Sequence, residues 1–421
     1  MNIEQQNQAR VNIKRLMEEQ GTFRLILKSL GGLLFLPFWY FERLLPRDRH
    51  LWVFGSWFGK RYSDNSRAMY EYVLENCPDI RPVWITRDAG VYDRLKSSGH
   101  PVAMAQSREG RRTCLKAGAA FITTSPLDMN EKFLNGAYMV WLWHGVGLKY
   151  IMADELRMFL WPKYSAFKKF KVKLNRFLFP WENKVRKDCL MNTGDFFTRF
   201  FCSGFELEPD KVWVDGYPRN DVLFNGKTQD IVREYREKFP TAKFIIYMPT
   251  HRINEHKGVP FNGFDGFGFD SARFFDVLQK NDYVFFNKGH FYDSNADIRI
   301  ENERFLNVND SMYDDLYAFI KDMDILITDF SSVYFDFILL GRPVILAPFD
   351  YDEYVSKERP LQFDYNEQEG VQVHDWNELM DVLENRKYFD SSDENIAKFH
   401  KHRDGESCRR ITQHLKRELD I

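Results

Sequence analysis

Short apolar runs that alternate with helical stretches constrain the fold of this sequence more than any other feature. Most of the runs are nearly all apolar, as strands buried on both faces are. The alternation predicts parallel sheets whose strands are joined by right-handed helical crossovers. We expect strands at residues 51–56, 82–86, 119–124, 138–144, 211–216, 243–249, 282–288, 324–329 and 343–348.

The series of strands is interrupted once, at residues 223–243, which are polar, charged and helical in pattern. We place a domain junction there and predict an α/β fold with two domains of comparable size. The predicted units are an N-terminal helical segment, two α/β domains and C-terminal helices, at residues 1–48, 49–230, 231–390 and 391–421.

Composition argues against several classes of function. The formal net charge is -2, so no global field favours nucleic acid. Five scattered cysteines without a CxxC pair indicate neither a disulfide framework nor a zinc site, and fit a reducing cytoplasm. The sequence has no Walker A, GxGxxG or HExxH motif. We therefore expect no metal and no bound cofactor.

Two segments are candidates for contact with lipid. Residues 23–45 contain an uncharged core at 29–41, which is shorter than the roughly 20 residues that a spanning helix needs. This segment is either a buried helix or an interfacial one with Trp39 and Tyr40 at the headgroups. The basic insertion at 163–187 interleaves aromatic residues with nine Lys or Arg and one Glu. It is either a solvated helix face or a surface for anionic lipid.

Candidate chemistry gathers where strands end, which is where open α/β sheets bind their ligands. His144 leaves one strand, and an imidazole there is suited to accept a proton near neutral pH. Two other strand ends pair cations with a hydroxyl, a glycine or an imidazole, a combination that suits phosphate. These two turns contain Pro249, Thr250, His251 and Arg252, and Lys288, Gly289 and His290.

A fourth strand end opens a helix with two small hydroxyls. Ser331 and Ser332 precede an apolar run at 333–340 that closes at Gly341. Ser331 alone suits an ordinary helix cap, but a second serine adds little to capping. Hydroxyls and N–H groups at a helix start form an anion site, and Asp336 is one turn further, within reach of a ribose or polyol hydroxyl. Together, the four strand ends predict a cleft between two domains that binds a nucleotide diphosphate donor.

In this order, the motifs resemble the CDP-glycerol glycerophosphotransferase family, whose enzymes build teichoic acids and related polyol-phosphate capsules. The matching stretches run from Trp143 to Cys408: "WHGVGLK" (143–149), "GYPRND" (216–221), "MPTHR" (248–252), "NKGH" (287–290), "ITDFSSVYFD" (327–336) and "DGESC" (404–408). The resemblance implies a GT-B-like fold of two Rossmann-like parallel-sheet domains with a cleft between them. It also implies an N-terminal acceptor domain and a C-terminal donor domain.

The implied reaction transfers a polyol phosphate from CDP-glycerol or CDP-ribitol to an acceptor hydroxyl and releases CMP. By this resemblance His144 is the general base, and His290 stabilises the pyrophosphate or the leaving CMP. The other residues that the resemblance assigns to the donor site are Gly145, Val146, Gly147, Leu148, Arg219, Pro249, Thr250, Arg252, Lys288, Gly289, Ser331, Ser332 and Asp336.

The family works at the inner face of the bacterial membrane on lipid-linked or polymeric acceptors, which favours lipid contact for 23–45 and 163–187. Two departures leave the polyol open. Val146-Gly147 replaces the family's usual Thr-Pro, and His251 stands where an aromatic residue is usual. The alternatives are a GT-B glycosyltransferase that uses a nucleotide sugar, and an inactive scaffold in a polymer-assembly complex.

Overall fold

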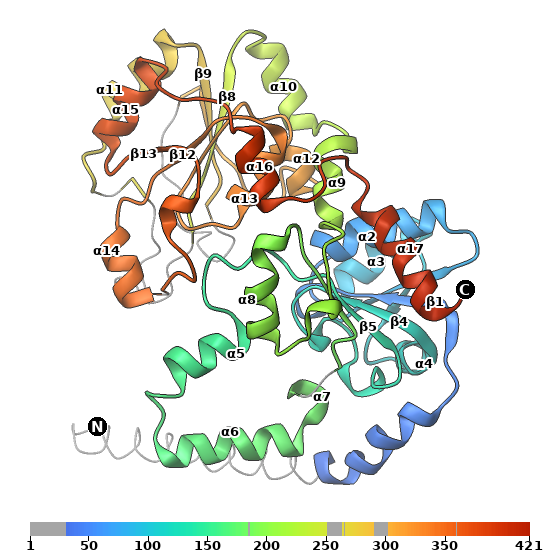
Figure 1. Ribbon diagram of the computed structural model, residues 1–421. Helices are drawn as coiled ribbons and strands as arrows, with labels where there is room; N and C mark the ends of the chain where they lie inside the picture. The colour runs from blue at the N-terminus through green and yellow to red at the C-terminus, as the bar shows by residue number, and fades with distance from the viewer. Residues whose placement is uncertain (1–30, 184–185, 251–262, 265, 290–301, 359) are drawn as a thin grey trace, which may run out of the picture.

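Two parallel sheets form the framework of the molecule (Figure 1). The structure is a computed structural model, and it describes residues 31–183, 186–250, 263–264, 266–289, 302–358 and 360–421. In the described chain, every strand pairing within the sheets is parallel. The predicted α/β fold with two parallel sheets is therefore confirmed.

The first sheet has seven strands in the order β3-β2-β1-β4-β5-β6-β7. The chain reverses its direction of strand addition between β1 and β4, so a crevice at their carboxyl ends is the expected ligand position. The strands are β1 (Asp48–Phe54), β2 (Arg81–Thr86), β3 (Val102–Met104), β4 (Ala117–Ile122), β5 (Tyr138–Trp141), β6 (Cys189–Met191) and β7 (Val212–Trp213).

The second sheet has six strands in the order β10-β9-β8-β11-β12-β13, with the corresponding reversal between β8 and β11. It therefore repeats the order of the first six strands of the other sheet. Its strands are β8 (Lys243–Met248), β9 (Tyr283–Asn287), β10 (Phe305–Asn307), β11 (Ile325–Thr328), β12 (Val344–Leu346) and β13 (Val371–Gln372).

Helices connect the strands, and one buried cluster of apolar side chains runs through both halves of the molecule. The helices whose bounds are described are α2 (Asp64–Asn76), α3 (Ala89–Ser97), α4 (Arg108–Lys116), α5 (Met152–Glu155), α6 (Ala166–Leu178), α7 (Pro180–Asn183), α8 (Asp195–Phe205), α9 (Pro218–Asn225), α10 (Asp230–Lys238), α11 (Ser271–Lys280), α12 (Leu316–Ile320), α13 (Val333–Phe337), α14 (Tyr351–Glu353), α15 (Trp376–Glu384), α16 (Asp393–Phe399) and α17 (Ser407–Leu419). In Figure 1, α17 crosses back from the second sheet to lie beside α2.

All nine predicted strands are present, although several end earlier than expected. Four strands were not predicted, namely β3, β6, β10 and β13, and each has only two or three residues. Runs that short show no readable period. The helix predicted at 333–340 forms as α13 and one 3-10 turn, and it ends as expected at Gly341, whose φ is +68°. The domain limits at residues 48, 230 and 390 stay predictions.

Candidate active site

His144 lies just beyond the end of β5, in a sharp turn. Trp143 before it has a left-handed φ of +58°, a conformation that stores strain in a bulky residue. The imidazole lies beside two indole rings, with centroids 4.1 Å away at Trp143 and 5.4 Å away at Trp57. Its Nδ1 is 3.3 Å from the carbonyl oxygen of Thr123. Because a carbonyl only accepts, Nδ1 carries the proton in this contact and Nε2 keeps the lone pair that a general base needs.

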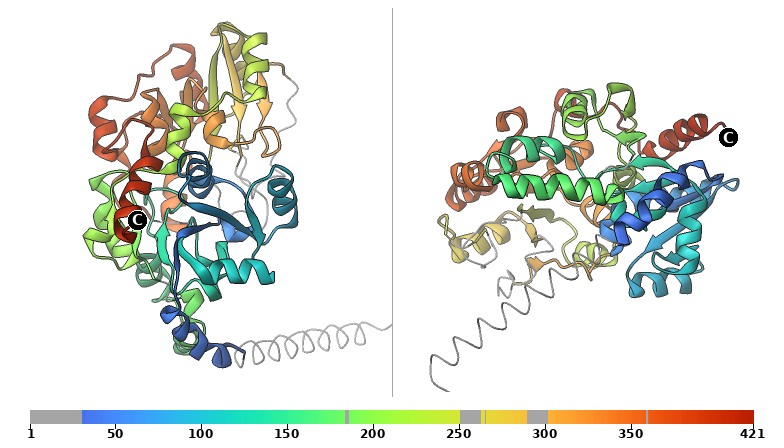
Figure 2. Two further views of the ribbon diagram at one scale, coloured as in Figure 1. Left: turned by 90° about the vertical axis from the view of Figure 1, so that its right-hand side faces the viewer. Right: turned by 90° about the horizontal axis from the view of Figure 1, so that it is seen from below.

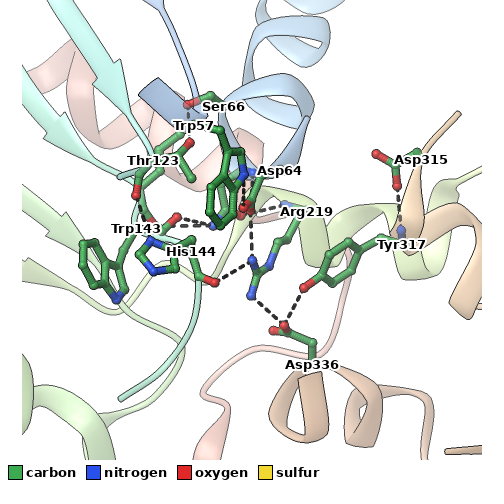
Figure 3. Close-up of polar contacts among 12 residues, drawn as sticks. Trp57, Asp64, Ser66, Thr123, Trp143, His144, Arg219, Asp315, Tyr317 and Asp336 are labelled. Atoms are coloured by element: carbon green, nitrogen blue, oxygen red, sulfur yellow. Dashed lines mark hydrogen bonds and ion pairs between the residues drawn. The ribbon is translucent and has the colours of Figure 1, made fainter. Parts of the chain in front are cut away.

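Side chains from two helices hold this strained turn in place (Figure 3). The amide of Asn65, at the start of α2, donates to the carbonyl oxygen of Trp143 over 2.9 Å. Arg219, at the start of α9, donates from Nη1 to the carbonyl oxygen of His144, also over 2.9 Å. Both donors are buried. The position of His144 is thus fixed through its backbone as well as through its ring.

The turn meets the second half of the molecule at Ser332. A side chain on Gly145 would place its Cβ 2.6 Å from the Ser332 hydroxyl, so only glycine fits there. The φ of Gly145 is +154°, which also favours glycine. The structure therefore brings the predicted base and the predicted phosphate-binding helix start side by side, from different sheets.

Arg219 joins the two halves through a buried ion-pair network (Figure 3). Its Nη1 is 2.9 Å from Asp64, and its Nη2 is 2.7 Å from Asp336 on α13. The hydroxyl of Tyr317 donates to the same oxygen of Asp336 over 2.7 Å. Burial disfavours the charge on Arg219, but the carboxylates of Asp336 and Asp64 help to raise its pKa well above its ordinary range.

This network bears on two predicted donor-site residues. Arg219 and Asp336 were expected to face the donor, yet their side chains are only 7% and 2% exposed and they bind each other. In this arrangement they connect α9 to α13, and a contact with substrate stays a prediction for both.

The second sheet has its own group of polar residues at the β8–β11 reversal. Asp329 follows β11, and its Oδ1 accepts the N–H of Thr250 over 2.8 Å and that of Phe330 over 2.6 Å. The Ser331 hydroxyl accepts the N–H of Val333 over 3.4 Å, as a helix-capping serine does. Both serines are partly exposed, and so are Pro249 and Thr250.

Lys288 follows β9 and is buried against Asp310. Its Nζ is 3.1 Å from Oδ1 of Asp310, and Arg61 from the first half binds the other oxygen of Asp310, also over 3.1 Å. Burial opposes the charge on Asp310, but hydrogen bonding by Tyr313 and the charge of Lys288 hold the pKa of Asp310 below its ordinary value. No described atom lies within 4 Å of the position that a Cβ on Gly289 would take.

The remaining residues of the "WHGVGLK" stretch form contacts between the two halves. Val146 and Leu148 are buried, and the carbonyl oxygen of Leu148 accepts the N–H of Gln362 over 2.9 Å. A Cβ on Gly147 would lie 2.9 Å from the amide of Gln362. These residues therefore pack against the second half, and their predicted contact with the donor stays a prediction.

His290, Arg252 and His251 lie outside the described residues, so their predicted roles are untested. Sequence reasoning missed three residues that shape the site, namely Asp64, Asn65 and Asp128, whose carboxylate accepts the N–H of Thr123 over 2.8 Å. Asp64 and Asn65 begin a helix that follows the first strand, which is a readable signal for polar groups near a ligand. In the described part of the chain, no group of three or more His, Cys, Asp or Glu side chains is placed to hold a metal ion.

Comparison with known proteins places this arrangement in a family. The profile of CDP-Glycerol:Poly(glycerophosphate) glycerophosphotransferase matches residues 38–416. The chain belongs to this family. The resemblance inferred from the motifs is thereby confirmed, and the match also covers β1 to β5, which the motifs did not reach.

Curated relatives of this glycerophosphotransferase family member make teichoic acids. A teichoic acid glycerol-phosphate transferase of Staphylococcus aureus is 28% identical over 95% of this chain and 98% of its own length. A teichoic acid poly(glycerol phosphate) polymerase of Staphylococcus epidermidis is 29% identical over 75% of this chain. The chain spans only 42% of that polymerase, so the longer protein has a large part with no counterpart here.

Solved structures support the fold. A histidine-to-alanine variant of the wall teichoic acid polymerase TagF has a TM-score of 0.71 and 24% identity, over 100% of this chain and 98% of the other. A TagF variant soaked with CDPG has a TM-score of 0.68 at 24% identity. A UDP-N-acetylglucosamine 2-epimerase is more distant, with a TM-score of 0.50 and 12% identity. The predicted GT-B-like fold is confirmed.

Proposed function

We propose that this protein transfers a polyol phosphate, glycerol phosphate first, from a CDP-polyol to an acceptor hydroxyl in teichoic acid synthesis. The acceptor is lipid-linked or polymeric. Family membership supports the reaction class, and the teichoic acid relatives support the pathway. One observation of the structure carries the assignment of the site. A histidine fixed for proton acceptance lies at the point where the first sheet meets the serine-bearing start of α13.

The chemistry follows from that placement. The acceptor oxygen attacks the phosphorus that bears the polyol, and the bond from that phosphorus to the bridging oxygen breaks. CMP leaves with the bridging oxygen, and Nε2 of His144 takes the proton of the attacking hydroxyl. Ser331 and Ser332 bind donor phosphate at the start of the helix, where N–H groups favour negative charge. The pyrophosphate role of His290 belongs to the same proposal.

We also propose that the protein docks on an anionic membrane surface through α6. No described residue of this helix is buried. It carries a row of exposed apolar side chains, at Phe167, Phe170, Leu174 and Phe177, which are between 41% and 65% exposed. Lysines at 168, 169, 171 and 173 flank them, with Arg176. An amphipathic helix with basic flanks binds at the boundary between headgroups and acyl chains.

The helical residues 31–41 extend this surface. Seen from below in Figure 2, they lie close to α6 and α7 at the same end of the molecule. Trp39, Phe179 and Trp181 form a small buried cluster that joins the two segments. Leu34 and Tyr40 are 83% and 54% exposed on this helix. None of the described helices has the length and apolar character that crossing a membrane requires.

The deciding experiment measures CMP release from CDP-glycerol and CDP-ribitol, with and without a polyol-phosphate acceptor. Acceptor-dependent CMP from one donor establishes the reaction and names the polyol. If a nucleoside diphosphate is released from a nucleotide sugar instead, the protein is a glycosyltransferase. Membrane docking is tested separately by flotation with anionic and neutral vesicles, comparing the wild type with Phe167→Ser/Phe170→Ser. The same substitution at exposed Phe389 is the control.

A further inference from the structure

The turn that follows β1 is the most strained segment near His144. Trp57, Phe58 and Gly59 have φ values of +46°, +58° and +74°, so three consecutive residues are left-handed. Left-handed conformations disfavour bulky side chains by roughly 1–2 kcal/mol per residue. Two aromatic residues here therefore need a structural reason, since glycine or asparagine would form the same turn with less strain.

Two buried carboxylates fix the conformation of this turn through hydrogen bonds. The N–H of Phe58 donates to Asp128 over 2.7 Å, and the indole N–H of Trp57 donates to Asp64 over 3.1 Å. Asp128 also accepts the N–H groups of Thr123 and Thr124, each over 2.8 Å. Thr123 supplies the carbonyl oxygen that orients His144. One carboxylate thus fixes both the aromatic turn and the support of the base.

The turn lies where the first sheet is expected to bind its ligand. It leaves β1 at the reversal between β1 and β4, and β5, the strand that precedes His144, lies on the other side of β4. Figure 3 places the indole of Trp57 beside the imidazole, and their centroids are 5.4 Å apart. Trp57 is partly exposed and Phe58 is 44% exposed. An aromatic surface therefore adjoins the atom that must receive the acceptor's proton.

We propose that the Trp57–Phe58 turn binds the acceptor. The terminal sugar or polyol unit packs its C–H face on the indole of Trp57, while one of its hydroxyls reaches Nε2 of His144. A polyhydroxylated carbon skeleton suits an aromatic ring, which offers apolar area beside polar neighbours. The donor, in contrast, needs groups that bind phosphate, and the second sheet presents Thr250, Ser331 and Ser332. This assignment rests on the proposed function, and it makes the acceptor the substrate that binds at the first sheet.

The kinetic test varies the acceptor at saturating CDP-polyol in four variants: Trp57→Leu, Trp57→Phe, Phe58→Ala and Phe389→Ala. The KM for acceptor rises about threefold to tenfold in Trp57→Leu, the range that one aromatic contact supports. It rises less in Trp57→Phe, which keeps an aromatic face, and Phe389→Ala matches the wild type. Because Phe58 is exposed, Phe58→Ala folds even if Trp57→Leu does not, and it also raises the KM. The donor Kd stays within about twofold throughout.

A binding test separates this proposal from the reaction itself. Calorimetry in a His144→Ala background titrates a soluble disaccharide acceptor with or without a terminal glycerol phosphate. Weaker binding of either acceptor in Trp57→Phe or Phe58→Ala supports the subsite, and the acceptor affected identifies the unit that packs there. Unchanged binding of both, or a parallel loss of donor affinity, overturns it. Absence of CMP release by the wild type would instead refute the proposed reaction and leave the binding result standing.

Discussion

At the reversal point of each sheet, the strand ends where a ligand crevice is expected, here called the first and the second crevice, are built alike but carry different side chains. In each, a buried aspartate joins the turns that leave the two strands at the reversal point. Asp128 accepts N–H groups from Phe58 after β1 and from Thr123 after β4. Asp329 accepts N–H groups from Thr250 after β8 and from its own neighbour after β11. The two carboxylates are 0% and 2% exposed.

The two crevices differ in the side chains of the turns that Asp128 and Asp329 join. The first crevice presents a strained aromatic turn and an oriented imidazole, whereas the second presents a threonine and two serines next to a helix start. The buried aspartate that joins two turns, Asp128 or Asp329, is therefore a feature of the fold that both sheets share. The chemistry of each crevice depends on the other side chains of those turns. If this distinction is correct, substitutions in the first crevice change the rate of proton transfer and the KM for acceptor. Substitutions in the second crevice change the Kd for the donor.

The largest expected effect separates the two crevices by function. His144→Ala should lower the rate of transfer by about 10² to 10⁴, the range for loss of a general base. The Kd for CDP-polyol, measured by calorimetry, should change by less than about twofold, since we propose that the donor binds at the second sheet. His374→Ala, at an exposed histidine, is the control. An equal loss of donor affinity would remove the base assignment.

Breaking the link between the crevices should destabilise the whole molecule. Arg219→Met leaves Asp64 and Asp336 buried without their cation, and removing one member of a buried ion pair costs about 3–5 kcal/mol. Urea unfolding should report this loss as a lower midpoint. Lys280→Met, in the exposed pair with Asp276, should change stability by less than about 1 kcal/mol. Equal effects would show that the Arg219 network is no more important than a surface pair.

Asp128 and Asp329 should contribute different amounts to the free energy of unfolding. Among the described residues, Asp128→Ala leaves the N–H groups of Phe58, Thr123 and Thr124, the more distant N–H of Ser125 and one hydroxyl without their acceptor, whereas Asp329→Ala leaves two N–H groups. At about 1 kcal/mol or more for each unpaired buried donor, and counting only the contacts of 2.8 Å or less, we expect losses of about 4 and 2 kcal/mol in the free energy of unfolding. Urea titrations of both variants test the order. The reverse order would contradict the view that the first crevice is the more tightly held.

The sequence predicted the framework of both crevices, because buried parallel strands leave continuous apolar runs. It also placed His144, Ser331 and Ser332 just after strands, as the structure has them, while their roles toward a ligand stay predictions. It did not reveal Asp128, which lies in a short 3-10 turn outside the motifs, and which joins residues 123–125 to the distant turn at Phe58. Hydrogen bonds between distant segments leave no periodic signal in a sequence.

Arg219 and Asp336 illustrate a second limit. Their motifs marked them as important, and both were expected to face the donor. Their burial against each other depends on how the two sheets meet, which local pattern does not encode. The left-handed turn at Trp57–Phe58 was hidden for a related reason, because aromatic residues rarely adopt that conformation and nothing in their identity suggests it.

Removing hydroxyls from the second crevice should weaken the binding of the donor without changing that of the acceptor. Ser331→Ala and Ser332→Ala should each raise the Kd for CDP-polyol by about tenfold, since a hydrogen bond to a charged phosphate is worth about 1.5 kcal/mol or more. The KM for acceptor should stay near its wild-type value in steady-state assays. Ser356→Ala, at an exposed helical serine, serves as the control. A donor Kd unchanged in the double variant would contradict the phosphate role of this helix start.

The smallest expected effect is a pH dependence of stability that comes from His400, a residue in contact with the second sheet's helix α13. His400 is buried, and its Nε2 is 2.6 Å from the carbonyl oxygen of Phe335 on α13, the helix that begins beside Ser332. Burial lowers the pKa of His400 to about 4, so the unfolded chain binds the additional proton more readily as pH falls below about 6.5. Stability that is fully present above that pH is then lost progressively toward pH 4. Burial raises the pKa of Glu42 to about 7, so Glu42 changes stability in the same pH range in any variant that keeps it. Between pH 7 and 5.5 we therefore expect the wild type to lose about 1 kcal/mol in urea unfolding relative to His400→Gln. An identical pH dependence of stability in the two proteins would contradict the assignment to His400.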